Sequence, residues 1–347
     1  MISLALSYLS EFIDPGKFWP LAFFGLAYPF IILLNLMASF YWILKRNWRF
    51  VLPILVILLG FKEFKRNFSF HLNEEIHPAK NLKVMTYNVH SFRPLEKGNT
   101  DVRKEILNII RNEDPDILGC QEFYTRPKGE YAVLDSLKKI LHHPYYFYHK
   151  VDSNSFESRG MVIFSKYPIK NKASMGFDKS QTVNGTLMGD IITPSGPFRF
   201  YCVHLQSIDF RVIDYDYIIR VKQRIKPELK PTKRILEKLK VAFIKRAEQA
   251  NEIHKSIQES QLPVLVMGDF NDTPVSYSYK TILGNLNSSF EAHGNGIGRT
   301  YNGSFPNFQI DHILCDSNFE ICGYKIIEKK LSDHFPVRAN LVLKGKP

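Results

Sequence analysis

The sequence lacks the short motifs that mark the commonest phosphate-binding and zinc-binding proteins. No GxxxxGK[ST] loop occurs, which excludes a nucleoside triphosphatase of that type. Neither a CxxC pair nor an HExxH motif occurs, which excludes the common kinds of zinc chemistry. No internal repeat is present either.

Cysteine is also scarce, with four residues in a chain of 347. Cys120, Cys202 and Cys315 lie within apolar, strand-like runs, a setting typical of small buried thiols. Cys315 and Cys322 could instead pair across a hairpin, which spacing alone does not decide. The cysteines therefore do not identify the compartment.

What the sequence does have is an excess of positive charge, formally +12, concentrated in two segments. Residues 1–70 carry seven basic and three acidic side chains, and residues 211–246 carry twelve and four. The rest of the chain carries 27 of each sign. Because that remainder is neutral, the composition argues against a nucleic-acid grip spread over the whole protein.

A long uncharged run near the N-terminus predicts a membrane span. No charged residue lies between Lys17 and Lys45, and a helix needs about 20 apolar residues to cross the hydrocarbon core. Trp19 and Trp42 lie 23 positions apart, about 35 Å on a helix, which suits aromatic anchors at the two interfaces. We therefore expect a span over about residues 18–44.

A second apolar run follows closely and predicts a shorter span over about residues 50–64, with a partial span at 1–13. Between the two runs Lys45, Arg46 and Arg49 crowd a short loop, which the positive-inside rule places in the cytoplasm. If the second run crosses, everything after it lies outside; if it rests in the interface, the rest stays cytoplasmic. We favour the crossing, and so expect residues 1–70 to anchor an integral inner- or plasma-membrane protein with an extracytoplasmic catalytic domain.

The remaining chain, residues 80–345, alternates strand-like and helical patterns. Apolar residues at helical spacing predict helices over residues 101–112 and 132–141. Short apolar runs bounded by turn residues predict strands over 82–87, 117–120, 160–165, 186–192, 198–205, 263–267, 310–314 and 336–343.

Polar side chains recur where these predicted strands end, which is where open sheets place active sites. The positions are Asn88, Glu122, His204, Asp269, Asn271 and Asp311, with Asp333 and His334 just before the last strand. Glu122 suits a hard cation such as Mg²⁺, with Asn88 as a neutral oxygen ligand. His334 suits a general base, and His204, Asn271 and Arg159 suit the stabilisation of phosphoryl oxygens. The set therefore predicts a metal-dependent phosphoester hydrolase.

Taken in chain order, these segments resemble the endonuclease/exonuclease/phosphatase superfamily, to which DNase I-like nucleases, abasic-site endonucleases, inositol polyphosphate 5-phosphatases and neutral sphingomyelinases belong. The resemblance covers about residues 80–345. The matching segments are Thr86-Tyr87-Asn88, Gln121-Glu122, Ser158-Arg159-Gly160, Val203-His204-Leu205, Gly268-Asp269-Phe270-Asn271-Asp272, Ile310-Asp311-His312-Ile313-Leu314 and Ser332-Asp333-His334-Phe335-Pro336-Val337.

The resemblance implies an α/β fold of four layers, α/β/β/α, with two mixed β-sheets packed face to face. It also implies a role for each position. Glu122, Asn88 and Asp333 would hold Mg²⁺ (or Mn²⁺), and His334 would act as the base, oriented by Asp311. Asp269 would handle a proton or water near the phosphate. Asn271, His204 and Arg159 would contact the phosphoryl oxygens.

Two features depart from the resemblance. His312 stands where the family more often has an aromatic residue, which would add a titratable group near the base. Residues 206–262 form a long basic insertion whose apolar period predicts a helix from Thr232 up to Pro263. Its basic face is either solvated or turned toward an anionic surface, and it carries Lys233, Arg234, Lys238, Lys240, Lys245 and Arg246.

We therefore expect a membrane-anchored phosphodiesterase or phosphatase that acts as a monomer, with no protein partner indicated. Its substrate would be a phosphate ester, in nucleic acid or in a lipid headgroup of the sphingomyelin or phosphoinositide kind. The alternative is a protein without enzymatic activity, a membrane-anchored binding module. The loss of a motif residue would favour this alternative, but all the named motif residues are present.

Overall fold

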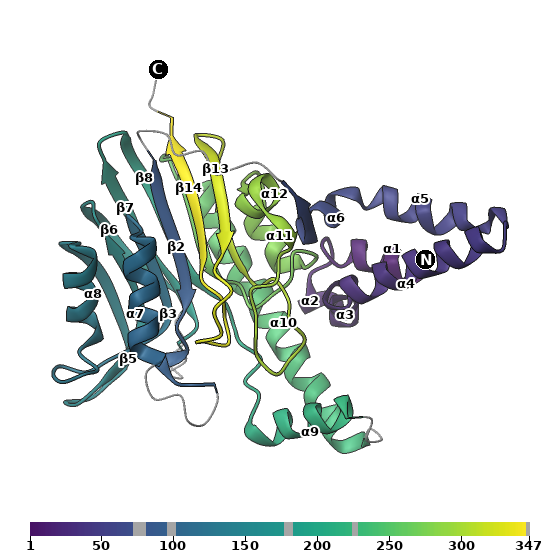
Figure 1. The fold of residues 1–347 in the computed structure, drawn as a ribbon, viewed down its shortest axis with the longest axis horizontal. Helices are drawn as coiled ribbons and strands as arrows, with labels where there is room; N and C mark the ends of the chain where they lie inside the picture. The colour runs from purple at the N-terminus through teal and green to yellow at the C-terminus, as the bar shows by residue number, and fades with distance from the viewer. Residues whose placement is uncertain (72–80, 96–101, 177–182, 224–227, 345–347) are drawn as a thin grey trace.

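In the computed structural model, which describes residues 1–71, 81–95, 102–176, 183–223 and 228–344, two six-stranded β-sheets pack face to face (Figure 1). The first sheet has the strand order β13 (Phe319–Ile326), β14 (Val337–Leu343), β2 (Leu82–Asn88), β3 (Ile117–Thr125), β5 (Ser158–Ser165) and β4 (Tyr145–Ser153). The second has the order β10 (Asn287–Ser288), β12 (Asp311–Cys315), β9 (Val264–Asp269), β8 (Gly196–His204), β7 (Gly185–Thr193) and β6 (Ile169–Met175).

Each sheet contains one parallel pair of strands. β2 runs parallel to β3 and β8 runs parallel to β9, while the other neighbouring strands are antiparallel. Helices cover the outer faces. The mixed sheets and the four-layer order confirm the predicted α/β fold.

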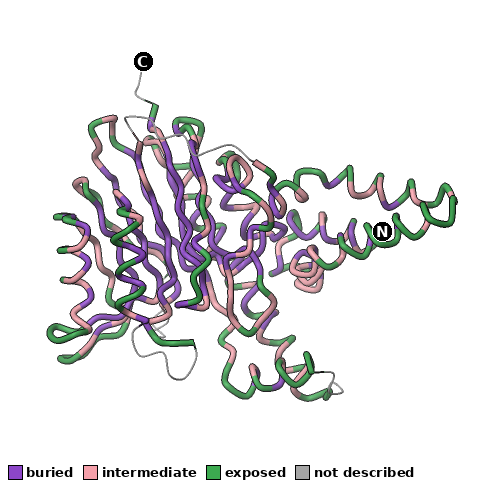
Figure 2. The backbone as a smooth tube through the Cα atoms, in the orientation of Figure 1, coloured by how far each residue is buried: buried purple, intermediate pink, exposed green. Residues whose placement is uncertain are grey.

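The core between the sheets explains why the central strands read as continuous apolar runs, since they are covered on both faces. The side chains that fill this layer are almost completely buried and include Val84, Ile163, Leu187, Phe200, Met267 and Ile313. Helices α7 (Val102–Glu113) and α8 (Val133–Leu141) pack on the first sheet, and α10 (Leu229–Gln258) and α11 (Tyr277–Leu283) pack on the second. Figure 2 shows the burial concentrated in the inner strands.

The strands and helices predicted for residues 80–345 are present, whereas three strands of seven or more residues escaped prediction, as did the two- and three-residue strands β1, β10 and β11. β4 and β6 lie at sheet edges, where their side chains are mostly half-buried or exposed. β13 also lies at an edge and contains a bulge near Gly323. Edge strands need no continuous apolar run, so their sequences give a weak periodic signal.

The N-terminal unit, residues 1–70, does not form the continuous helix that the long apolar run predicted. Its elements are α1 (Ile2–Leu9), α2 (Pro15–Phe18), η1 (Trp19–Leu21), α3 (Ala22–Leu26), α4 (Tyr28–Leu44), η2 (Trp48–Phe50), α5 (Val51–Leu59), α6 (Phe61–Asn67) and β1 (Phe68–Phe70). Pro20 and Pro29 each begin a new helical segment, because proline fits the first turn of a helix and not its interior.

The spans predicted at 18–44 and 50–64 do not correspond to single continuous helices. Within the described residues, no helix alone combines the length and the apolar character that crossing a membrane requires. The segments Pro15–Leu26 and Tyr28–Leu44 meet that test only jointly, with a bend of 52° between them. α4 and α5 form a hairpin that projects away from the sandwich (Figure 1).

The N-terminal unit packs closely against the sandwich. β1 pairs with β11 (Asn295–Ile297), and the ring of Phe23 lies edge-on to Phe243 of α10 at 5.2 Å. The Ser10 hydroxyl donates to the Val275 carbonyl at 3.3 Å. Leu4, Tyr28, Ile32 and Val275 form a buried apolar cluster at the base of the hairpin. Residues 1–70 are therefore joined to the sandwich through a packed interface.

A buried ion pair stabilises this unit. Arg66 donates to both oxygens of Glu11, at 3.0 and 2.8 Å, and these residues are only 6% and 2% exposed. Arg66 also lies 3.9 Å from Glu291 of α12 (Ser289–His293), on the sandwich side. The pair thus links α1, α6 and the sandwich.

The predicted basic helix of the insertion is present as α10, but its basic face is not simply solvated. Arg246 is buried, at 1% exposed. Arg234 and Lys238 both donate to the buried carboxylate of Asp214, at 2.6 and 2.9 Å. All four cysteines are free and buried, which confirms the expected buried thiols at Cys120, Cys202 and Cys315 and leaves Cys315 and Cys322 unpaired with each other.

We expect Glu11→Ala to lower the free energy of unfolding of the N-terminal unit by about 3 kcal/mol, because it leaves the Arg66 guanidinium buried without its main counter-charge. All three tryptophans lie in this unit, at positions 19, 42 and 48, so their fluorescence during denaturant unfolding of the full chain reports on it. The control is Glu105→Ala, an exposed acid on α7. Equal denaturant midpoints for the two variants would show that the ion pair does not stabilise the unit.

Candidate active site

The second sheet places three predicted site residues side by side at one end of the sandwich. The strand register pairs Asp311 with Asp269 and pairs His204 with Asp269. Gly268 lets β8 and β9 approach each other here, since a Cβ at this position would lie 2.0 Å from the Val203 carbonyl oxygen. The row Asp311–Asp269–His204 thus follows from strand order alone.

The first sheet supplies the facing residues. Asn88 ends β2, and Glu122 lies in β3 at a bulge between Cys120 and Phe123. Glu122 adopts a positive φ of 50°, a conformation that costs energy for a residue with a side chain and that is common at functional sites. Asp333 and His334 come from the loop before β14. The Ser332 hydroxyl fixes that loop by donating to the Asn88 carbonyl at 2.7 Å.

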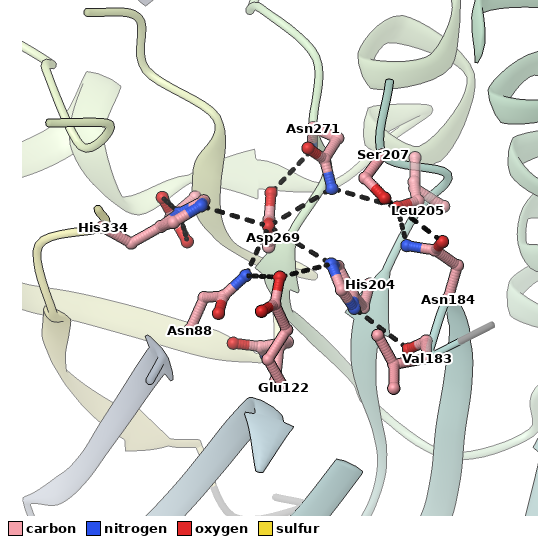
Figure 3. A network of polar contacts seen from close by, with 12 residues as sticks. Asn88, Glu122, Val183, Asn184, His204, Leu205, Ser207, Asp269, Asn271 and His334 are labelled. Carbon is pink, nitrogen blue, oxygen red and sulfur yellow. Dashed lines mark hydrogen bonds and ion pairs between the residues drawn. The ribbon is translucent and has the colours of Figure 1, made fainter. Parts of the chain in front are cut away.

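Asp269 stands at the centre of these contacts (Figure 3), with an exposed fraction of 0%. Its Oδ2 accepts from the side-chain amide of Asn88 at 3.0 Å and from that of Asn271 at 3.3 Å. The same oxygen lies 3.5 Å from His204 Nε2 and 3.6 Å from His334 Nε2. Its Oδ1 accepts from the Asn271 backbone N–H at 2.8 Å. Side chains from both sheets therefore converge on one buried carboxylate.

His334 and Asp311 form a hydrogen-bonded dyad next to this carboxylate. His334 Nδ1 lies 2.9 Å from Asp311 Oδ2, which turns Nε2 toward Asp269. Burial alone would lower the pKa of His334, but the Asp311 and Asp269 carboxylates outweigh it and hold that pKa well above its usual value. Burial, reinforced by Asp311, also raises the pKa of Asp269. The charge of each group therefore influences the protonation of the other, across a gap of 3.6 Å.

His204 presents an unsatisfied nitrogen to the same place. Its Nδ1 lies 3.0 Å from the Val183 carbonyl, so Nδ1 carries the proton of the neutral ring. Its Nε2 is buried and has no hydrogen-bond partner within the described residues, although it lies 4.0 Å from Glu122 Oε1. Because buried nitrogens are normally paired, this one points to a ligand that the site is built to receive.

Glu122 and Asp333 form the more accessible part of the site, at 28% and 21% exposed. The imidazole of His90 lies between them, with Nδ1 3.7 Å from Glu122 Oε2 and 3.3 Å from Asp333 Oδ1. His90 is not among the site residues predicted from the sequence. Its place follows from a turn in which the His90 N–H donates to Asn88 Oδ1 at 3.1 Å, and only the Asn-x-His spacing could have pointed to it.

Two groups of side chains could hold a cation. The buried carboxylates of Asp269 and Asp311 and the ring of His334 bring their ligand atoms within 4.8 Å of one another, but these atoms already bond to each other and to amides. Glu122 and Asp333 instead offer partly exposed carboxylate oxygens that converge on a single imidazole. Hard divalent cations prefer such oxygen ligands and usually keep several waters, so this second group fits Mg²⁺ better.

The structure does not bring Arg159 into this cluster. Its guanidinium lies 5.7 Å from the ring centroid of Tyr124 and lines hollows beside the site. His312 does not reach the base either. It points to the opposite face of β12, packs against Phe270 and Tyr279, and lies 3.2 Å from the Asp272 carbonyl. His312 thus takes the place of an aromatic residue, and burial lowers its pKa to about 4.

The site opens into a cavity of about 220 Å³ that both polar and apolar side chains line. The polar ones are His90, Glu122, Ser207, Asp209, Tyr215, Arg246, Asp269, Asn271, Thr273, Tyr301, Asp333 and His334. The apolar ones, called the apolar wall below, are Leu26, Ile208, Phe210, Leu239, Phe305, Pro306, Phe308 and Ile310. The cavity therefore offers both charged and apolar contacts to a ligand.

Arg246 borders the cavity and is a second residue that sequence reasoning misplaced. Its guanidinium donates to the Asn271 carbonyl and lies 3.5 Å from Asp272 Oδ1. Its Nη2 has no partner in the described part of the chain. Arg246 thus fixes the loop that carries Asn271. Arg246 differs from the more exposed basic residues nearby only in that it faces that loop. The sequence does not show which way a side chain of this helix points.

Comparison with known proteins agrees with this geometry. Residues 85–334 match the family described as Endonuclease/Exonuclease/phosphatase family. Residues 1–67 match a separate family described as a domain of unknown function. No curated protein matches the chain.

Solved structures share the fold. An endonuclease/exonuclease/phosphatase from Beutenbergia cavernae aligns with a TM-score of 0.55 at 18% identity, over 77% of this chain and 73% of its own. The human Nocturnin catalytic domain with bound sulfate anion aligns with a TM-score of 0.54 at 17% identity, over 77% and 96%. A mannosyl-6-phosphatase from Bacteroides thetaiotaomicron aligns with a TM-score of 0.50 at 21% identity, over 75% and 99%. At these identities the likeness establishes the fold alone.

The environment of His312 predicts a change in acid stability. Its folded-state pKa of about 4 lies below the usual value of 6.5, so between these pH values only the unfolded chain binds the proton, and stability falls as pH falls. When the pH falls from 7 to 4.5, the free energy of unfolding of the wild type should decrease. In His312→Phe this decrease should be smaller by about 2 kcal/mol, because the titrating ring is gone.

Denaturant unfolding of both proteins at the two pH values measures this difference. His142→Asn, a change at an exposed helix end with φ of 52° that asparagine tolerates, is the control and should behave as the wild type does. An unchanged pH dependence in His312→Phe would show that this ring titrates normally in the folded chain.

Proposed function

The chain belongs to the endonuclease/exonuclease/phosphatase family, and from that premise we propose that it is a Mg²⁺-dependent hydrolase that cleaves a P–O bond by attack of water. The main support is that His334, Asp269 and the unpaired His204 nitrogen converge. They lie beside the partly exposed carboxylates of Glu122 and Asp333. This arrangement offers what phosphoryl transfer needs, namely proton handling and positive or hydrogen-bonding groups around a phosphoryl oxygen.

The side chains divide the work by position. His334, held by Asp311, and Asp269 lie where they can take the proton of the attacking water and return one to the leaving oxygen. His204 Nε2, when protonated, and the Asn271 amide would donate to the phosphoryl oxygens. Arg246 positions Asn271 through its backbone carbonyl. Arg159 lies against Tyr124 and lines the hollows beside the site, so its contact with the phosphoryl oxygens stays a prediction.

Glu122, Asp333 and Asn88 would hold the cation. When bound, Mg²⁺ (or Mn²⁺) would neutralise and polarise the phosphoryl group. His90 lies between the two carboxylates. Its imidazole would therefore move aside when the cation binds there. A catalytically silent binding module is less well supported, because every position named in the catalytic and metal sets carries a side chain able to do its task.

We further propose that the α4–α5 hairpin anchors the protein in a bilayer. Apolar side chains cover its exposed surface, and basic residues cluster at its far end, at Lys45, Arg46 and Arg49. Both ends of the hairpin return to the sandwich, so the positive-inside rule favours a cytoplasmic tip and an extracytoplasmic catalytic fold. The protein would act as a monomer on a phosphate ester.

We expect the purified full chain to hydrolyse at least one ester among duplex DNA, RNA, phosphoinositides and sphingomyelin in the presence of Mg²⁺. His334→Ala and Glu122→Ala should each lower the rate about a thousandfold, because they remove proton transfer and the main metal ligand. Chelation should abolish activity and added Mg²⁺ should restore it. His142→Asn is the matched control and should retain activity. Variants as active as the wild type would refute the assignment.

The proposed topology predicts opposite accessibility of the hairpin tip and the catalytic fold. The native cysteines are buried, so a thiol reagent should react mainly with an introduced, exposed cysteine. Asn47→Cys then reports the accessibility of the tip, and Lys329→Cys that of the sandwich. In spheroplasts a membrane-impermeant maleimide should label Lys329→Cys directly and Asn47→Cys only after permeabilisation. The reverse pattern would place the catalytic fold in the cytoplasm, and labelling of both without permeabilisation would contradict a crossing.

A further inference from the structure

We infer that the apolar wall of the cavity binds the hydrocarbon chain of a membrane-resident phosphate ester, and that the N-terminal unit is part of this binding site. This inference rests on the proposed hydrolase activity and specifies its substrate class. The residues concerned are those of the apolar wall, to which α3, α10 and the segment 305–310 all contribute.

Leu26 is the N-terminal unit's contribution to the wall. It ends α3 and lines the same cavity as Glu122 and His334. Gly25 allows this approach, because a Cβ there would lie 2.2 Å from the Val275 carbonyl oxygen. The edge-on contact of Phe23 with Phe243 holds α3 against α10. Without the N-terminal unit, the cavity would lack the Leu26 part of its lining.

The apolar wall meets the hairpin through one aromatic contact. Phe308, in the wall, lies 6.2 Å from the ring of Phe30 near the start of α4. Phe30 is 52% exposed and begins a stripe of exposed apolar residues at helical spacing on the face opposite Tyr28 and Ile32. The stripe consists of Phe30, Leu33, Leu34, Met37, Tyr41 and Leu44. A hydrocarbon chain could therefore pass from the bilayer along α4 to the cavity without crossing water.

The apolar wall favours one substrate class. Hydroxyls or amides of a free sugar phosphate or a nucleotide that lay against Leu26, Leu239 and Phe308 would gain no hydrogen bond from these side chains, which costs free energy. An acyl or alkyl chain would instead gain about fourfold in affinity for each methylene group that leaves water. In the reaction water adds its oxygen to phosphorus, the P–O bond to the leaving alcohol breaks, and the leaving oxygen takes the proton.

The test compares esters that differ only in their chain. The full-length protein is given hexadecyl and methyl 4-nitrophenyl phosphate, and hexadecyl and methyl phosphate, each with phosphatidylcholine vesicles present. Released 4-nitrophenol or inorganic phosphate measures hydrolysis. We expect the hexadecyl member of at least one pair to be cleaved with a kcat/KM at least about a hundredfold higher than its methyl partner.

Variants separate binding in the cavity from mere attachment to the bilayer. Leu26→Ala should raise KM for the hexadecyl ester about tenfold, and by less for the methyl ester, with co-sedimentation with vesicles unchanged. Leu26→Met, which keeps the volume, should behave as the wild type does. Leu36→Ala is the matched control, since Leu36 is an exposed leucine of α4 outside the stripe.

Each failure has its own signature. Equal kcat/KM for the hexadecyl and methyl esters, or a Leu26→Ala protein identical to the wild type, would overturn the inference while leaving the hydrolase assignment in place. Cleavage of none of the four esters above the level of His334→Ala would overturn the proposed function and the inference together.

Discussion

The burial of the Asp269 carboxylate is the constraint on which the rest of this site depends. A carboxylate at 0% exposure is stable only where hydrogen bonds or opposite charges compensate for the water it has lost. Asn88 from the first sheet, Asn271 and His204 from the second, and His334 from the closing loop supply that compensation. Because these partners come from both layers, a shift of either sheet would disrupt the network. Fold stability and catalytic geometry are thus tied to one group.

The sequence predicted this network well where it depends on strand ends. Asn88, His204, Asp269 and Asp311 each begin or end a strand, so correct strand assignment brings them to one edge. It failed where a side chain's direction depends on a turn or on packing over long range. His90 reaches the site through a turn with positive φ, while Arg159 turns outward onto Tyr124. Helical periodicity likewise could not show which arginine of α10 is buried.

The N-terminal unit illustrates a different limit of sequence reasoning. Composition correctly identified a segment too apolar to be ordinary surface, but an uncharged run does not report where the helix bends. Pro20 and Pro29 divide the run into short helices, and the resulting fold packs α1, α3 and the base of α4 on the sandwich. The same residues that predicted a span therefore also form an interface, which hydropathy alone cannot reveal.

That interface connects location to specificity. A flexible tether would raise the local concentration of every phosphate ester at the bilayer without choosing among them. A packed unit that places Leu26 in the cavity wall can choose, because it removes water from one side of the bound ligand. The buried pair of Glu11 and Arg66 then matters beyond stability. It holds α1 and α6 together beside the sandwich, and so keeps α3 in the position from which Leu26 completes the cavity.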